Sequence, residues 1–216
     1  MEDVLAVYHR PYDPNRPVVC LDECSKALHS SARPDMEAEP GKTACLDYEY
    51  VRQGTRNLFL WTEPLGGRRK VRVTERRTAV DLAEQLRLLV DVDYPQAQKI
   101  VLVTDNLNTH SQACLYEQFS PEEAWRIASR IEWHYTPEHA SWLNMAEIEL
   151  SALSRQCLNR RIPDADTLAA EINAWETERN NANVRIHWRF TVEDARIKLR
   201  SLYPVRKELK TSLTDY

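Results

Sequence analysis

Short apolar runs along the chain have the length and composition of β-strands. Six segments fit this description: residues 18–21, 44–52, 57–62, 70–75, 100–104 and 131–135. Pro64-Leu65-Gly66-Gly67 is a strong turn signal between the third and the fourth of these segments. The pattern therefore predicts a hairpin inside a larger sheet.

Apolar residues with a helical period separate and follow these strands. They predict helices at residues 78–89, about 120–130, 141 to about 159, from about 166, and 191–204. Ser141 is the expected N-cap of the third helix, and Thr191 begins a capping pattern at the last. A helix that leads into the strand at 100–104 is typical of a crossover between parallel strands.

The chain before residue 18 differs in character from the rest. Residues 1–10 can form a short helix, but Pro11, Pro14 and Pro17 exclude a helix over the next stretch. We therefore predict a linker or lead-in at 1–17, a core at 18–160 and a helical C-terminal extension of the same domain at 161–210. The element order, summarised as β-β-β-α-β-α-β-α, predicts an α/β fold with a mixed five-stranded sheet flanked by helices.

Composition excludes several classes of protein. With 216 residues and 43% hydrophobic content, the chain can bury a substantial core. No apolar stretch approaches the length of a membrane helix, and residues 1–4 do not resemble a signal peptide, so we expect a cytoplasmic protein. Five cysteines without a C-x-x-C pair indicate neither a disulfide framework nor a zinc knuckle.

Charge is distributed unevenly along the chain. The net charge is −4 overall, yet residues 1–150 hold 17 basic and 24 acidic side chains while residues 151–216 hold 12 and 9. An acidic metal site beside a locally basic binding surface has this distribution. An ordinary acidic domain with a basic helical end has it as well, so composition leaves both interpretations open.

Three acidic residues occupy settings that suit a metal site. Asp22 and Asp105 each end an apolar strand, and Glu147 lies near the start of a predicted helix. Buried strands that end in carboxylates place negative charge at one edge of a sheet, where hard divalent cations bind. These carboxylates predict metal-assisted phosphoryl transfer.

The residues around these acids resemble a known family. Residues 101–110 (VLVTDNLNTH) and 135–147 (YTPEHASWLNMAE) are similar to the catalytic core of DDE transposases, specifically the insertion-sequence-630 branch of the mariner-type superfamily. Residues 20–23 (CLDE) and 194–199 (DARIKL) add to the resemblance, which covers about residues 10–205. It implies a ribonuclease-H-like fold.

The resemblance assigns roles to particular residues. Asp22, Asp105 and Glu147 match the family's catalytic acids and would hold two Mg²⁺ or Mn²⁺ ions. Glu149 is the alternative third acid, because the interval from Asp105 to Glu147 is longer than is common in the superfamily. The polar neighbours Asn106, His110 and Asn144 would support these acids.

The implied activity is cleavage at transposon ends, followed by attack of the released 3′-hydroxyl on target DNA at TA sites. The implied partners are transposon-end and target DNA and a second copy of the chain. The family also places helix-turn-helix modules before its catalytic domain, and none fits here, so the chain resembles the catalytic half alone. A separate DNA-binding part would complete it.

Basic residues provide candidate DNA contacts in two places. They lie on the predicted hairpin and along the helix that follows Glu147: Arg68, Arg69, Lys70, Arg72, Arg155, Arg160 and Arg161. Such runs commonly form a solvated face, but beside a nuclease-like site they suit phosphate contacts.

Two other functions stay open from the sequence. The chain could be a stand-alone nuclease of the same fold, which strand-transfer products would exclude. It could also be an inactive remnant that binds DNA or a full-length partner. The intact acids Asp22, Asp105 and Glu147 favour an enzyme.

Overall fold

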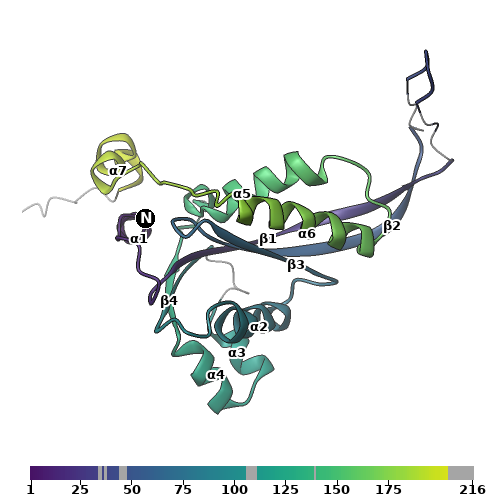
Figure 1. Cartoon of the computed structure of the whole chain (residues 1–216). Coiled ribbons are helices and arrows are strands. Elements are labelled where there is room, and N and C mark those ends of the chain that lie inside the picture. The colour runs from purple at the N-terminus through teal and green to yellow at the C-terminus, as the bar shows by residue number, and fades with distance from the viewer. Residues whose placement is uncertain (34–35, 37, 44–47, 106–110, 139, 204–216) are drawn as a thin grey trace, which may run out of the picture.

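The computed structural model describes residues 1–33, 36, 38–43, 48–105, 111–138 and 140–203. Its centre is a five-stranded sheet in the order β3-β2-β1-β4-β5 (Figure 1). The strands are β1 (Val18–Ser31), β2 (Tyr50–Glu63), β3 (Arg68–Thr74), β4 (Ile100–Thr104) and β5 (Ile131–Tyr135). β1, β2 and β3 pair antiparallel, whereas β4 is parallel to both β1 and β5. This mixed sheet confirms the predicted fold class.

The structure corrects the early strands. Residues 50–52 and 57–62 do not belong to two separate strands, because one strand, β2, runs through Gly54 from Tyr50 to Glu63, and residues 44–47 of the first predicted segment lie outside the described residues. The outer half of β2 is exposed, and its sequence shows no alternation of apolar and polar residues. Gly54 has a positive φ of 91°, a backbone conformation that is common in turns. Pairing with an equally long β1 holds this half in place. The β1–β2 ribbon extends away from the rest of the sheet (Figure 1).

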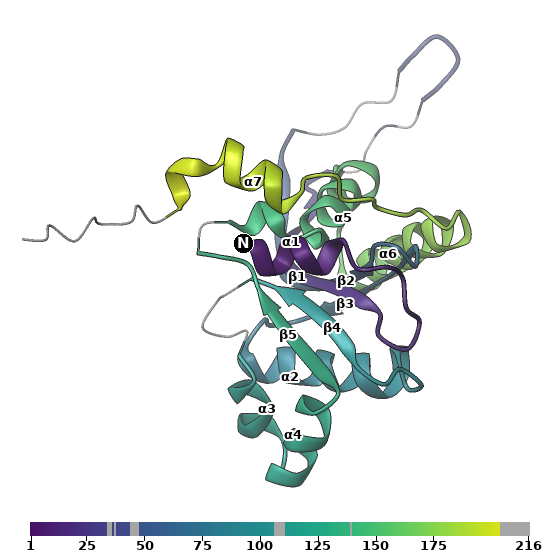
Figure 2. The same cartoon turned by 90° about the vertical axis from the view of Figure 1, so that its left-hand side faces the viewer.

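Helices cover both faces of the sheet (Figure 2). One layer contains α1 (Glu2–Tyr8), α5 (Ala146–Leu153) and α6 (Ala165–Asn181), which share a core with the sheet residues Cys20, Leu60 and Val103. The other layer contains α2 (Ala79–Leu88), α3 (Ala113–Gln118) and α4 (Pro121–Ala128), which pack on the opposite face with Val19 and Leu102. α7 (Val192–Lys198) follows α6 after an extended segment. Because successive side chains of a strand point to opposite faces of the sheet, the central strands contribute residues to both cores.

The lead-in is only partly extended. Val4, Leu5, Val7 and Tyr8 of α1 are buried in the same core as α5, so the first half of residues 1–17 packs as part of the domain and is not a free linker. Pro11, Pro14 and Pro17 follow α1 in the part without helix.

The helix predicted at 141–159 consists of three pieces. A 3₁₀ turn at Ser141–Leu143 precedes α5, and a π-helical turn at Ser154–Leu158 follows it. Ser141 is therefore not the N-cap of α5. The N-cap is Met145, whose side chain makes no cap hydrogen bond, while Oδ1 of Asn144 accepts the backbone N–H of Ala146, the first residue of α5, at 3.1 Å.

Two tryptophans of the helical layers are exposed. Trp125 on α4 is 68% exposed and Trp142 in the 3₁₀ turn is 46% exposed. Other apolar residues of the same segments fill the core, so helical periodicity alone does not identify these tryptophans as surface residues.

No helix among the described residues is long and apolar enough to cross a membrane.

Candidate active site

Asp22 lies in β1, and Asp105 directly follows the neighbouring strand β4. β1 and β4 run parallel, with Cys20 opposite Val103 at the last paired position. Each aspartate lies two residues beyond that pair, so strand alternation turns both toward the face where Cys20 and Val103 are buried. This is the face that α5 covers.

Asp22 is held by two hydrogen bonds to its carboxylate. Its Oδ1 accepts the backbone N–H of Glu23 at 2.8 Å, and its Oδ2 accepts the amide of Asn144 at 3.3 Å. The same Asn144 amide donates to the backbone carbonyl of Leu21 at 2.9 Å. Asn144 is fully buried, and it therefore connects β1 to the start of α5.

Glu147 projects from the first turn of α5 and is exposed. The pKa of Asp22 is raised to about 7, mainly by burial. The N–H of Glu23 opposes the rise, and repulsion from the carboxylates of Glu147 and Asp105 contributes to it. The three predicted acids thus influence one another electrostatically.

The cluster offers only oxygen donors, which is the ligand type that Mg²⁺ and Mn²⁺ prefer. A cation would also relieve the mutual repulsion of the carboxylates. Within the described ranges, no three acidic, histidine or cysteine side chains are close enough to hold one ion as they stand. Asn106 and His110, the predicted supporting residues after Asp105, lie outside the described residues.

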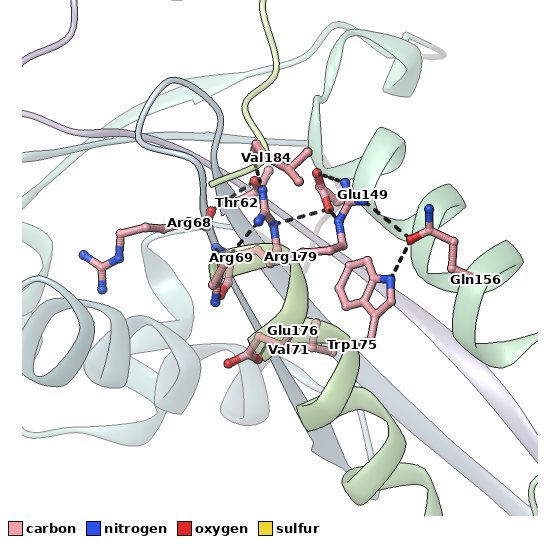
Figure 3. A network of polar contacts seen from close by, with 11 residues as sticks. Thr62, Arg68, Arg69, Val71, Glu149, Gln156, Trp175, Glu176, Arg179 and Val184 are labelled. Atoms are coloured by element: carbon pink, nitrogen blue, oxygen red, sulfur yellow. Dashed lines mark hydrogen bonds and ion pairs between the residues drawn. The ribbon is translucent and has the colours of Figure 1, made fainter. Parts of the chain in front are cut away.

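Glu149, the alternative third acid, is engaged elsewhere (Figure 3). Its side chain is fully buried, and Arg179 of α6 donates to both carboxylate oxygens at 2.9 and 3.1 Å. Arg69 of β3 adds an ion pair at 3.4 Å. Glu147 and Glu149 therefore differ in kind: one reaches solvent and the other joins α5 to α6 and the sheet.

Arg69 is a structural residue, which corrects its prediction as a DNA contact. It is only 2% exposed, and its guanidinium donates to the Asn180 side chain and to the Val184 carbonyl (Figure 3). The long side chain of Arg69 crosses beneath α6, where a buried cation requires the acid Glu149. Phosphate cannot reach it in this fold.

The other predicted hairpin cations also have intramolecular partners. Lys70 pairs with Glu176 at 2.7 Å, and Arg72 pairs with Asp93 at 2.7 Å. Arg68 is exposed, with its guanidinium 5.4 Å from the ring centre of Tyr94. Only Arg68 of this group presents its charge to solvent without an acidic partner among the described residues.

The basic residues after α5 divide in a similar way. Arg160 pairs with Glu171, and Arg161 donates to the Glu49 carbonyl at 3.1 Å. Arg155 is exposed and donates only to the Ser151 carbonyl, at 3.3 Å. Neither Arg155 nor Arg161 forms an ion pair with an acid in the described part of the chain, and Arg155 is the more exposed of the two.

Sequence reasoning missed two contributions to the site. The hydroxyl of Tyr8 donates to the Leu143 carbonyl at 2.7 Å, so α1 supports the turn that carries Asn144. Arg179 and Glu176 of α6 anchor α5 and β3. The sequence does contain a signal for Glu176 and Arg179. These two charged residues lie on the side of the helix that also carries the buried Ile172 and Trp175.

Comparison with known proteins agrees with this geometry. The chain is similar to a crystal structure of the Mos1 mariner paired end complex with Mn, at 17% identity and a TM-score of 0.51, over 84% of this chain and 55% of that one. It is also similar to the Mos1 strand transfer complex, at 16% identity and a TM-score of 0.54, over 84% of this chain and 54% of that one. These likenesses show the fold and confirm the predicted ribonuclease-H-like architecture.

The chain spans about half the length of these solved structures. A search of curated proteins finds no significant match. The family model described as DDE superfamily endonuclease matches residues 17–169, which is more than two thirds of the 216 residues. The matched range includes Asp22, Asp105 and Glu147. The chain belongs to the DDE superfamily of endonucleases.

Proposed function

We propose that this chain is the catalytic domain of a DNA transposase of the insertion-sequence-630 branch. It cleaves phosphodiesters at transposon ends and transfers the 3′-hydroxyl to target DNA at TA sites. The observation that carries the proposal is the shared register of Asp22 and Asp105, with Glu147 close enough to raise the pKa of Asp22.

Asp22, Asp105 and Glu147 would hold the divalent cations, Mg²⁺ or Mn²⁺, in this proposal. Two such ions supply activation of the attacking oxygen and stabilisation of the leaving oxygen in an in-line displacement. The solved Mos1 paired end complex contains Mn, which supports a divalent cation of this class.

The chain itself orients the ligands. Asn144 donates to Asp22 and accepts the N–H of Ala146, the first residue of the helix that carries Glu147, so one buried amide links two acids from different elements. Asn106 and His110 would support Asp105. Without a cation Asp22 is about half protonated near neutral pH, and binding of a cation would release that proton.

The proposed partners are DNA and a second copy of the chain. The Mos1 relatives are paired end and strand transfer complexes, which supports DNA as the substrate. Arg68 and Arg155 are the predicted phosphate contacts whose charge reaches solvent. A separate helix-turn-helix part would recognise the transposon ends, and action on chromosomal DNA would place the protein at the bacterial nucleoid.

Nicking of supercoiled plasmid in Mn²⁺ tests the proposal. Asp22→Asn, Asp105→Asn and Glu147→Gln should each abolish nicking, because each removes a charged oxygen ligand without leaving a cavity. Glu178→Gln, a change of the same type at an exposed site on α6, is the matched control and should retain activity. Full nicking by all three acid variants would disprove the proposal.

A second assay separates a transposase from a stand-alone nuclease. Labelled duplex ending in a free 3′-hydroxyl is incubated with plasmid, and joined products are sought. Strand transfer supports the transposase, whereas nicking without joining identifies the nuclease.

A further inference from the structure

The segment between α6 and α7 is an extended strip with alternating exposure. Along residues 184–190 the side chains of Val184, Ile186, Trp188 and Phe190 are partly buried, while those of Arg185, His187 and Arg189 are exposed. This period of two is that of an extended strand, although the segment belongs to no sheet. We call residues 184–190 the basic strip.

The inner side of the basic strip is fixed to the domain. Ile186, Trp188 and Phe190 pack against the core that contains α1 and α5. Ile186 also donates its backbone N–H to the Pro64 carbonyl at 3.0 Å, and the Val184 carbonyl accepts from buried Arg69 (Figure 3). Each basic residue lies in sequence between two residues whose side chains are partly buried, so its own side chain is directed outward.

The strip is also connected to the candidate active site. Trp188 stacks on Trp142 with ring centres 6.4 Å apart, and Phe190 meets the same ring edge-on at 6.1 Å. Trp142 lies two residues before Asn144, which bonds to Asp22. The strip thus lies on the same helical layer as Glu147.

The charges of the strip differ from those of the predicted DNA contacts. Most of the predicted cations have acidic partners, as in Lys70–Glu176 and Arg72–Asp93. Neither Arg185 nor Arg189 makes an ion pair with an acid among the described residues, whereas the nearby Arg196 and Lys198 pair with Glu2 and Asp194. Residues 184–200 contain five basic and two acidic side chains, so the surroundings do not cancel the strip's charge.

We propose that the basic strip binds the phosphate backbone of duplex DNA, with Arg185 and Arg189 as the main contacts and His187 between them. An extended segment from Arg185 to Arg189 covers roughly 13 Å, at about 3.3 Å per residue. Double-stranded DNA carries one negative charge per about 1.7 Å of helix axis, so two arginines at this separation can each contact a phosphate. Such contacts position DNA without reading its sequence. This inference deepens the proposed function, because the DNA would be the substrate of the adjacent carboxylates.

Salt-dependent binding of DNA is the direct test. Fluorescence anisotropy with a labelled random-sequence duplex, in Ca²⁺ or chelator, gives the affinity of the full chain as KCl is varied. The double variant Arg185→Gln/Arg189→Gln should bind about tenfold more weakly at 0.1 M salt, and the slope of log K against log[salt] should fall by about 2, since each phosphate contact contributes about 0.9.

Two matched variants keep the result interpretable. Arg87→Gln/Arg126→Gln removes the same formal charge from the opposite helical layer, where both arginines pair with Asp91, and should leave the slope unchanged. Arg185→Lys/Arg189→Lys keeps the charge and should keep most of the affinity. Because the strip's arginines point outward, the glutamine variant should melt within a few degrees of wild type.

The outcomes separate this inference from the proposed function. Unchanged affinity and slope in Arg185→Gln/Arg189→Gln, with metal-dependent nicking intact, overturn the strip alone. If the double variant has a smaller slope of log K against log[salt] but the wild-type chain never nicks DNA, the result supports DNA binding by the strip and overturns the proposed function. If the double substitution instead removes binding to vesicles of anionic phospholipid while DNA binding is unchanged, the strip faces a membrane surface and the inference is wrong.

Discussion

Asn144 donates its side-chain amide to Asp22 across 122 residues of sequence, and the same side chain accepts the N–H of Ala146, the first residue of the helix that carries Glu147. The contact makes the relation between a strand and a helix depend on one buried polar group. Its removal leaves the Leu21 carbonyl and the Ala146 N–H without their partner.

Asn144→Ala should therefore lower both stability and activity. An unsatisfied buried polar group costs about 1–3 kcal/mol, and Asp22 loses its orientation relative to Glu147. We expect a loss of nicking larger than tenfold even at temperatures where the variant is fully folded, because misplacement by about 1 Å can cost about a hundredfold. Urea unfolding and nicking rates measure the two effects. Asn173→Ala on the exposed side of α6 is the control, and equal behaviour of the two variants would contradict the positioning role.

Asp22 should make stability fall as pH rises when no metal is present. Its pKa is raised to about 7 in the folded protein from an ordinary value of 3.8, so the folded state holds the proton more tightly than the unfolded state. The destabilisation is absent below about pH 4, grows between about pH 4 and 7, and is complete above that range. Three pKa units correspond to an upper limit of about 4 kcal/mol.

Asp22→Asn removes this titration. In chelator the variant should exceed wild type in free energy of unfolding by an amount that increases from pH 5 to pH 8 and then levels off. Chemical denaturation at several pH values gives this difference. A difference that is constant with pH would show that burial and the neighbouring acids do not shift Asp22.

Glu147 and Glu149 should separate activity from stability. Glu147→Gln changes an exposed side chain, so the melting temperature should change little while nicking is lost. Glu149→Gln leaves Arg69 and Arg179 short of a buried counter-charge, and removal of one partner of a buried ion pair costs about 3–5 kcal/mol.

The combined change Arg69→Met/Glu149→Leu/Arg179→Met should recover much of the stability lost in Glu149→Gln, because apolar side chains of similar size can replace a buried ionic group. Thermal and urea unfolding of the three proteins decide the point. Normal stability of Glu149→Gln, together with loss of nicking, would make Glu149 the metal ligand.

Divalent metal should stabilise the wild-type chain. A cation that binds only the folded state adds about 2.7 kcal/mol at a hundredfold excess over Kd, which raises the melting temperature of a domain this size by several degrees. Mn²⁺ at constant ionic strength should produce this shift in wild type and little shift in Asp105→Asn. In chelator, Asp105→Asn should melt higher than wild type, because it relieves repulsion toward Asp22.

A melting temperature for Asp105→Asn that is lower in chelator but fully responsive to Mn²⁺ would make Asp105 a structural residue. Differential scanning fluorimetry with Mn²⁺, Ca²⁺ and chelator is sufficient for the comparison.

Some of the fold could be predicted because local pattern and tertiary structure agree. Every residue of β4 is buried, the edge strand β5 is partly buried, and the ends of both strands match the prediction. The exposed outer half of β2 could not be recognised, because long-range pairing with β1 and not burial holds it in place. The contacts of Asn144 with Asp22 and Ala146 could not be predicted either, since the sequence offers Ser141 as a conventional N-cap.

The predicted DNA contacts show a second limit of sequence reasoning. A run such as Arg68-Arg69-Lys70 does not reveal which charges meet acids from distant elements, and here Glu149 and Glu176 bind two of the three. The alternating positions of 184–190 were visible in the sequence, but without the contacts to Trp142 they indicated no particular location.

Tyr8 and Leu143 are separated by 135 residues, and their hydrogen bond joins the first helix to the turn before α5. Contacts this distant in sequence form late, because much of the chain must first be ordered. During synthesis the ribosome must release residues beyond Leu143 before α1 finds its place, and beyond Glu147 before the acidic cluster is complete. A nascent chain or an early-terminated fragment that ends before Glu147 therefore lacks the complete acidic cluster.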